Sequence, residues 1–169
     1  IIANKNLYED GLLKEEYYKK ILNNAEKIEA IIDYDRDYHF DYFAFTTLTR
    51  AYLLKFENKI IERPQDLWMR VALTVSCNEF NYEKVKNTYF ALSSGLYTHA
   101  TPTLFNSGLK MQQLSSCFLI GMEDDSIEGI FNTIKDCALI SKTAGGIGLH
   151  AHNIRASGSR IKSTNGKSN

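Results

Sequence analysis

The sequence predicts an α plus α/β chain, in which an N-terminal helical domain is followed by the truncated start of an α/β domain. Before about residue 100, apolar residues recur at intervals of three and four, the spacing of one helix face. After residue 101, two short apolar runs flank one well-signalled helix, an order typical of a parallel strand-helix-strand unit. We therefore expect domains at residues 1–100 and 101–169.

The helices of the first domain follow from spacing and from end signals. An amphipathic helix carries Tyr17, Ile21, Ala25, Ile28 and Ile32 on its apolar face. A second, more aromatic helix covers residues 40–54, and residues 54–61 form a short hairpin around Asn58. Pro64 suits the first turn of a third helix. A fourth covers residues 82–94, and Gly95 suits its left-handed end.

The second domain begins with residues 114–122, an apolar and β-branched run that predicts a buried strand. Cap residues at 124–126 then begin a helix. Its apolar stripe contains Ile127, Ile130, Phe131, Ile134, Cys137 and Ala138. The helix ends at Gly145 and Gly146, and residues 147–154 resemble a second strand. One such unit cannot close a sheet, so we expect the domain to be incomplete in this chain.

Charge and cysteine content exclude several classes of protein. Twenty basic residues balance twenty acidic ones in 169 residues, so no global field would attract nucleic acid or an anionic membrane. No apolar run approaches the roughly 20 residues that span a bilayer. Three widely spaced cysteines fit neither a disulfide framework nor a zinc site, which indicates a reducing cytoplasm. The first residues contain neither an initiator Met nor a signal sequence, so we expect the chain to start mid-protein.

The C-terminal segment has the composition of a phosphate site. No acidic residue follows Asp136, whereas the segment contains Lys142, Arg155, Arg160, Lys162 and Lys167 together with several glycines. Glycine lets backbone N–H groups approach a phosphate, and the basic side chains supply charge. A solvated loop with incidental lysines explains these residues equally well.

Two phosphate motifs are incomplete. Gly166-Lys167-Ser168 ends like a P-loop, but the position five residues before Gly166 is Ile161 instead of glycine. The glycine run at 145–148 follows a helix and leads into a strand, opposite to the order of a dinucleotide-binding turn. We reject both motifs.

The cysteines and histidines are ambiguous by themselves. An isolated cysteine in an apolar run, such as Cys117, is more often a small core residue than a reactive one. Cys137 lies in the helix stripe and Cys77 at a helix end, and both are interpreted as structural. His150 and His152 would share one strand face, but such a pair is more often structural than a metal site. No metal site is expected.

Several longer motifs occur along the chain in this order: YDRD (34–37), ERPQ (62–65), THATPTLFNSG (98–108), QLSSCFL (113–119), DDSIEGI (124–130), ISKTAGGIG (140–148), IRASGS (154–159) and TNG (164–166). Considered together, these motifs resemble the large subunit of ribonucleotide reductase, class I, of the eukaryotic and viral type. The resemblance covers nearly the whole chain in order.

The resemblance implies a helical domain followed by the opening of a ten-stranded α/β barrel, and an enzyme that reduces ribonucleoside diphosphates by radical chemistry. It implies that Cys117 belongs to the redox-active cysteine pair. It also implies that Thr101 and Ser116 contact the substrate diphosphate or ribose, and that Gly146 allows close approach of the substrate. The radical cysteine and the second redox cysteine would lie beyond Asn169, so we expect the isolated chain to be inactive.

The resemblance further implies a specificity site for ATP or dNTP effectors with Mg²⁺. Its residues would be Asp125, Ser126, Ile127, Lys142, Arg155, Ile161, Lys162 and Ser163. The helix that begins this site would pack across a large-subunit homodimer. No cofactor is expected on this segment itself, because the radical would come from the metal cofactor of a small subunit. Thioredoxin or glutaredoxin would reduce the cysteine pair.

Two other classes of function remain as alternatives. A nucleotide- or nucleic-acid-binding module without catalysis would use the basic segment, but residues 140–169 contain no aromatic residue to stack on bases. In a purely helical interaction domain, Cys117 and the glycines would be incidental.

Overall fold

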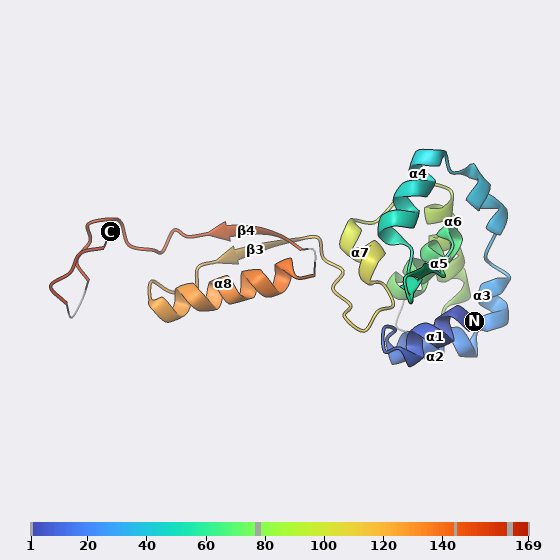
Figure 1. The fold of residues 1–169 in the computed structure, drawn as a ribbon, viewed down its shortest axis with the longest axis horizontal. Coiled ribbons are helices and arrows are strands. Elements are labelled where there is room, and N and C mark those ends of the chain that lie inside the picture. Colours follow the sequence, from blue (N-terminus) through green and yellow to red (C-terminus); the bar gives the residue numbers. More distant parts are fainter. Residues whose placement is uncertain (1, 77–78, 144, 162–163, 169) are drawn as a thin grey trace. The chain divides into compact units, whose positions relative to one another are not determined.

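The chain divides into two units, residues 1–114 and 115–169, in a computed structural model that describes residues 2–76, 79–143, 145–161 and 164–168 (Figure 1). The first unit is almost entirely helical. Its elements are α1 (Ile2–Glu9), α2 (Glu15–Asn23), α3 (Ala25–Glu29), the 3-10 helix η1 (Tyr34–His39), α4 (Tyr42–Thr47), the π-helix η2 (Leu48–Tyr52), β1 (Lys55–Phe56), β2 (Lys59–Ile60), α5 (Pro64–Val75), α6 (Tyr82–Ser93) and α7 (Thr101–Asn106).

Several of these elements lie where turn and helix-end residues in the sequence predicted them. The hairpin around Asn58 is confirmed, since β1 and β2 pair antiparallel and Glu57 and Asn58 both have positive φ. Pro64 begins α5, as predicted. The helix predicted over residues 82–94 is α6, and Gly95 follows it with φ +70°.

One predicted helix proved to be two. The apolar positions from Tyr17 to Ile32 were assigned to a single helix, but the chain breaks at Asn24 between α2 and α3. The Asn24 side chain donates to the carbonyl oxygen of Lys20 at 3.0 Å. An asparagine that bonds the local backbone competes with helix continuation, which explains the break. Ile32 lies beyond the end of α3.

The core of the first unit lies between α5 and the helices around it. Leu67, Val71, Ala72 and Leu73 of α5 are almost fully buried. They belong to a cluster with Leu7, Leu13, Tyr17, Ile21, Ile28, Leu48, Leu53, Trp68, Met69, Val85, Tyr89, Leu92 and Leu104. The cluster takes side chains from elements along the whole unit. Because α5 contributes more of them than any other element, it is the central helix of the core.

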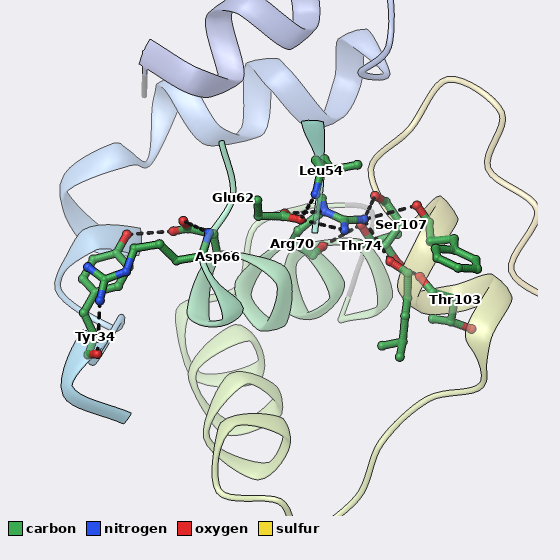
Figure 2. Close-up of polar contacts among 11 residues, drawn as sticks. Tyr34, Leu54, Glu62, Asp66, Arg70, Thr74, Thr103 and Ser107 are labelled. Carbon is green, nitrogen blue, oxygen red and sulfur yellow. Dashed lines mark hydrogen bonds and ion pairs between the residues drawn. The ribbon is translucent and has the colours of Figure 1, made fainter. Parts of the chain in front are cut away.

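A buried ion pair links α5 to the chain on either side of it (Figure 2). Arg70 Nε lies 2.7 Å from Glu62 Oε1, and the two side chains are only 2% and 7% exposed. The same guanidinium donates through Nη1 to the carbonyl oxygens of Ser107 at 2.8 Å and Leu104 at 3.2 Å. Glu62 Oε2 accepts from the backbone N–H of Leu54 at 2.9 Å. One charged pair therefore holds the hairpin, α5 and α7 together.

Burial by itself would lower the pKa of Arg70. The charge and hydrogen bonds of Glu62 outweigh this effect and raise the pKa above its ordinary value. The guanidinium therefore keeps its proton inside the core, and all its bonds to α7 remain charge-assisted.

Helix α7 was not predicted, and it lies in the first unit. The sequence placed the domain boundary between residues 100 and 101, whereas the compact units separate between Leu114 and Ser115. The bonds from Arg70 and the contacts of Leu104 with the core attach α7 to the helical unit. Thr103 Oγ1 also donates to the carbonyl oxygen of Leu114 at 2.9 Å, which fixes the end of this unit.

The second unit contains β3 (Cys117–Gly121), α8 (Ile127–Ser141) and β4 (Gly146–His150). The two strands pair parallel, with Cys117 opposite Gly146 and Gly121 opposite His150, so the predicted strand-helix-strand unit is confirmed. Ser126 caps α8, its Oγ accepting from the N–H of Gly129 at 3.0 Å. None of the described helices is long and apolar enough to cross a bilayer.

The sequence predicted that the strand and the apolar stripe of the helix in this unit are buried. Within this unit that prediction is wrong. Leu119 of β3 is 95% exposed, and Ile127, Phe131 and Ile134 of the α8 stripe are 77%, 64% and 50% exposed. Two strands and one helix present too little apolar surface to enclose these side chains. The pattern identified faces suited to packing, and within this unit nothing covers them.

We expect Arg70→Met to lower the free energy of unfolding of the first unit by about 3–5 kcal/mol, because it leaves the Glu62 carboxylate buried without a partner. The measurement is urea-induced unfolding followed by the fluorescence of Trp68, the single tryptophan of the chain. Arg50→Met, which removes an exposed guanidinium, is the matched control and should change little. The double variant Glu62→Leu with Arg70→Met should recover part of the loss. An Arg70→Met chain as stable as its parent would contradict the role given to the pair.

Candidate functional site

Cys117 is an exposed thiol at the first position of β3. Its register partner is Gly146, the first residue of β4, whose N–H donates to the carbonyl oxygen of Ser116 at 2.7 Å. The apolar residues around Cys117 in the sequence favoured a buried core position. Within this unit the thiol is exposed instead. The structure brings Ser116, Cys117 and Gly146 together at one end of the strand pair.

Gly146 keeps the space beside this thiol open. A Cβ at position 146 would lie 3.6 Å from Cys117 Sγ and 3.3 Å from the carbonyl oxygen of Ser116. Any larger residue would place its side chain against the sulfur. The glycine thus leaves room for another molecule to approach Cys117 from the side of β4.

The glycine directly before Gly146 serves packing. A Cβ at Gly145 would lie 2.6 Å from Ile140 Cγ2 and 3.0 Å from Phe118 Cε2. Gly145 therefore lets the chain pass close to the end of α8 and to β3. A Cβ at Gly148 would meet only the tip of Leu119, a side chain that is 95% exposed. Of the three glycines, Gly146 is the one beside the thiol.

Thr101 is exposed at the first position of α7 and belongs to the first unit. Its Oγ1 lies 3.2 Å from the hydroxyl oxygen of Tyr52. No sequence motif connects Tyr52 with Thr101, because 49 residues separate the two.

A second group of predicted residues gathers at the start of α8. Arg155 Nε lies 2.5 Å from Asp125 Oδ2, and Arg155 Nη2 donates to the carbonyl oxygen of Asp125 at 2.9 Å. Both side chains are about one-third exposed or less. Ser126 and Ile127 follow Asp125 directly. The structure therefore places Asp125 and Arg155 side by side.

Beside this ion pair lies an open hollow. It is lined by Asp125, Arg155, Ser159, Arg160 and Ile161. Ile161 was predicted for this site, whereas Ser159 and Arg160 were not. The signal for Arg160 was present in the basic run, but the sequence did not distinguish it from the other basic residues there.

Backbone hydrogen bonds order the segment that forms the hollow. The N–H of Gly158 donates to the carbonyl oxygen of Ser168 at 2.7 Å, and the N–H of Ile161 donates to that of Gly166 at 3.1 Å. Gly158 has φ +85°, a conformation that glycine adopts without strain. A solvated loop and a phosphate-binding segment were both open for these residues, and the structure shows that the segment folds back on itself.

The structure does not bring every predicted residue to this hollow. Lys142 is the C-cap residue at the far end of α8, and at about 1.5 Å per residue the helix places it roughly 25 Å from Asp125. Lys162 and Ser163 lie outside the described residues, as does Cys77. Cys137 is half-buried on α8, which agrees only partly with the core position expected.

His150 and His152 lie side by side, with ring centroids 4.1 Å apart. Among the described residues, no group of three or more His, Cys, Asp or Glu side chains is arranged to hold a metal ion.

Comparison with known proteins gives the same domain order as the structure. A family model described as ribonucleotide reductase, all-alpha domain, matches residues 38–112, and one described as ribonucleotide reductase, barrel domain, matches residues 115–169. The predicted order, a helical domain followed by the start of a barrel, is confirmed.

Curated relatives agree with the family models. The chain is 52% identical over 158 residues to a ribonucleoside-diphosphate reductase large subunit of Arabidopsis thaliana, and 51% identical over 158 residues to a large chain 2 of Saccharomyces cerevisiae. It is 53% identical over 159 residues to a large subunit of Plasmodium falciparum. Each match covers 94% of this chain and only 18–20% of the relative.

We expect Gly146→Ala to slow alkylation of Cys117 by iodoacetamide at least about twofold, because the added methyl shields one side of the sulfur. Site-resolved mass spectrometry separates Cys117 from the other thiols. Gly121→Ala, at the opposite end of β3, is the matched control, since a Cβ there meets nothing within 4 Å. Equal alkylation rates in the two variants would show that Gly146 does not control access to the thiol.

Proposed function

This chain belongs to the ribonucleotide reductase large-subunit family, and we propose that it carries one of the redox-active thiols of a class I ribonucleoside-diphosphate reductase together with part of its effector site. The observation that carries the proposal is the exposed Cys117 with Gly146 beside it. The complete activity belongs to a longer protein, because this chain spans about a fifth of its relatives.

The reaction explains why a thiol is needed there. A ribonucleoside diphosphate and a dithiol give a deoxyribonucleoside diphosphate, water and a disulfide. Loss of the 2′-hydroxyl as water requires a proton donor on that face of the sugar, and the reduction requires two electrons. Cys117 would supply one of the two sulfurs, and a second cysteine elsewhere in the intact protein would close the disulfide. The small subunit's metal cofactor would supply the radical that starts the reaction.

We assign substrate binding in the intact enzyme to Thr101, Ser116 and Gly146. Ser116 precedes Cys117, and Gly146 leaves space beside the sulfur for the sugar. The hydroxyls of Thr101 and Ser116 would donate to oxygens of the diphosphate or ribose. The ten-stranded barrel would be completed by chain that follows in the longer protein.

The hollow at the start of α8 is proposed as part of the specificity site. Asp125 accepts hydrogen bonds and suits a ribose hydroxyl, while Arg155 and the neighbouring basic residues suit the triphosphate of an ATP or dNTP effector with its Mg²⁺. Lys142 is at the opposite end of α8 and would reach this hollow only from another subunit, which agrees with a homodimer. Effector binding and dimer formation would then be coupled.

The partners follow from the same proposal. A small subunit generates the radical, and thioredoxin or glutaredoxin restores the dithiol after each turnover. Such chemistry requires reduced thiols, so we place the enzyme in the cytoplasm. A nucleic-acid-binding module is not favoured, because the relatives are reductases and the basic segment has no aromatic residues.

We expect Cys117→Ser in the intact large subunit to reduce dithiol-driven deoxynucleotide formation by about 10²-fold or more, because the hydroxyl cannot form the disulfide. The measurement is conversion of radiolabelled CDP in the presence of the small subunit. Cys137→Ser, which removes a thiol from the middle of α8, should retain turnover. Normal turnover in Cys117→Ser would refute the assignment.

We expect Arg155→Ala to abolish most of the thermal stabilisation that a dNTP gives the intact large subunit. An effector at 100 times its dissociation constant stabilises the folded state by about 2.7 kcal/mol, and a variant that binds weakly loses this increment. Calorimetry with and without dTTP measures it, and Arg50→Ala serves as the charge-matched control. A dNTP-dependent shift in Tm that survives in Arg155→Ala would remove Arg155 from the effector site.

A further inference from the structure

Tyr52 and Thr101 bring two hydroxyl groups together from distant parts of the first unit. Tyr52 is the last residue of the π-helix η2, and Thr101 is the first residue of α7. Their hydroxyl oxygens are 3.2 Å apart, and either can be the donor. Single π-helical turns occur frequently at functional sites.

The ring of Tyr52 is held against α7 itself. It stacks on Phe105, with ring centroids 4.9 Å apart and planes 18° from parallel. Phe105 lies one helical turn after Thr101, so the ring runs along the helix and its hydroxyl meets the first residue. The following residue, Leu53, is buried in the core. Tyr52 is thus fixed at its ring and at its backbone.

The backbone of α7 is also fixed. Arg70 bonds the carbonyl oxygens of Leu104 and Ser107, and Ser107 Oγ donates to the carbonyl oxygen of Thr103 at 2.6 Å. The Thr101 side chain is exposed, however, and its hydroxyl can rotate unless a neighbour holds it. Within the described part of the chain, Tyr52 is the neighbour with a hydrogen-bonding group in range.

We propose that Tyr52 is a positioning residue for substrate binding, acting through Thr101. A threonine hydroxyl has one proton and two acceptor lone pairs. When the phenol donates to Thr101 Oγ1, the Thr101 proton is left free to donate to an oxygen of the substrate diphosphate or ribose. Tyr52 thereby fixes both the rotamer and the donor direction of Thr101. The inference rests on the proposed contact between Thr101 and the substrate.

The test compares Tyr52→Phe, Thr101→Val and the double variant in the intact large subunit assayed with its small subunit. Tyr52→Phe keeps the ring stack and removes only the hydroxyl. It should raise KM about 2- to 10-fold with kcat nearly unchanged, the change expected for loss of one hydrogen bond in binding. Because diphosphate and ribose are common to all substrates, KM for ADP and CDP should rise by the same factor.

The double variant distinguishes positioning from an independent effect. If Tyr52 acts only through Thr101, adding Tyr52→Phe to Thr101→Val leaves KM where Thr101→Val alone puts it. Tyr42→Phe is the matched control, since Tyr42 on the neighbouring α4 is 87% exposed, and it should leave KM unchanged. The Tm of Tyr52→Phe should stay within a few degrees of the parent, which separates positioning from folding.

Each other outcome has its own meaning. An unchanged KM in Thr101→Val shows that Thr101 does not bind substrate, which overturns the substrate contact in the proposed function. A raised KM in Thr101→Val with an unchanged KM in Tyr52→Phe overturns the positioning role alone. Additive effects in the double variant also overturn it, as does a fall in kcat with KM constant.

Discussion

The buried pair of Arg70 and Glu62 is the interaction on which the first unit depends. A guanidinium and a carboxylate, both almost fully removed from solvent, are tolerated because each fills its remaining hydrogen-bonding capacity with backbone groups. Those backbone groups come from the hairpin on one side and from α7 on the other. The pair therefore also attaches the last helix of the unit to the core.

This attachment matters for function because α7 begins with Thr101. The helix has only six residues, and its apolar contact with the core cluster is made by Leu104. Arg70 fixes its carbonyl end, and the stack of Tyr52 on Phe105 fixes its side. The exposed hydroxyl of Thr101 is thus connected to the core through the bonds of Arg70 to the α7 backbone and through the Tyr52–Phe105 stack. Precise placement of a binding group on a short element requires this kind of support.

The second unit presents the Cys117 sulfur with free space beside it. The parallel register sets Cys117 against Gly146, and the absent side chain leaves the thiol open. Gly145 lets the chain before β4 pack closely against Ile140 of α8 and Phe118 of β3, next to this open space. At the other end of α8, Asp125 draws Arg155 onto the helix start. One helix therefore connects the thiol end of the unit with the basic hollow.

The sequence by itself determined the features that arise from a few neighbouring residues. Proline at 64, glycine at 95 and asparagine at 58 fixed helix ends and a turn, and the apolar spacing fixed the order of helices and strands. The matched motifs led to the family and to Cys117. Only the tertiary structure decided which distant groups meet: Arg70 with α7, Tyr52 with Thr101, and Asp125 with Arg155, across separations of 37, 49 and 30 residues. It also decided that the α8 stripe stays exposed in this unit. Local preferences act through steric and hydrogen-bonding effects over one or two turns, whereas these pairings depend on how the helices pack, which no local pattern records.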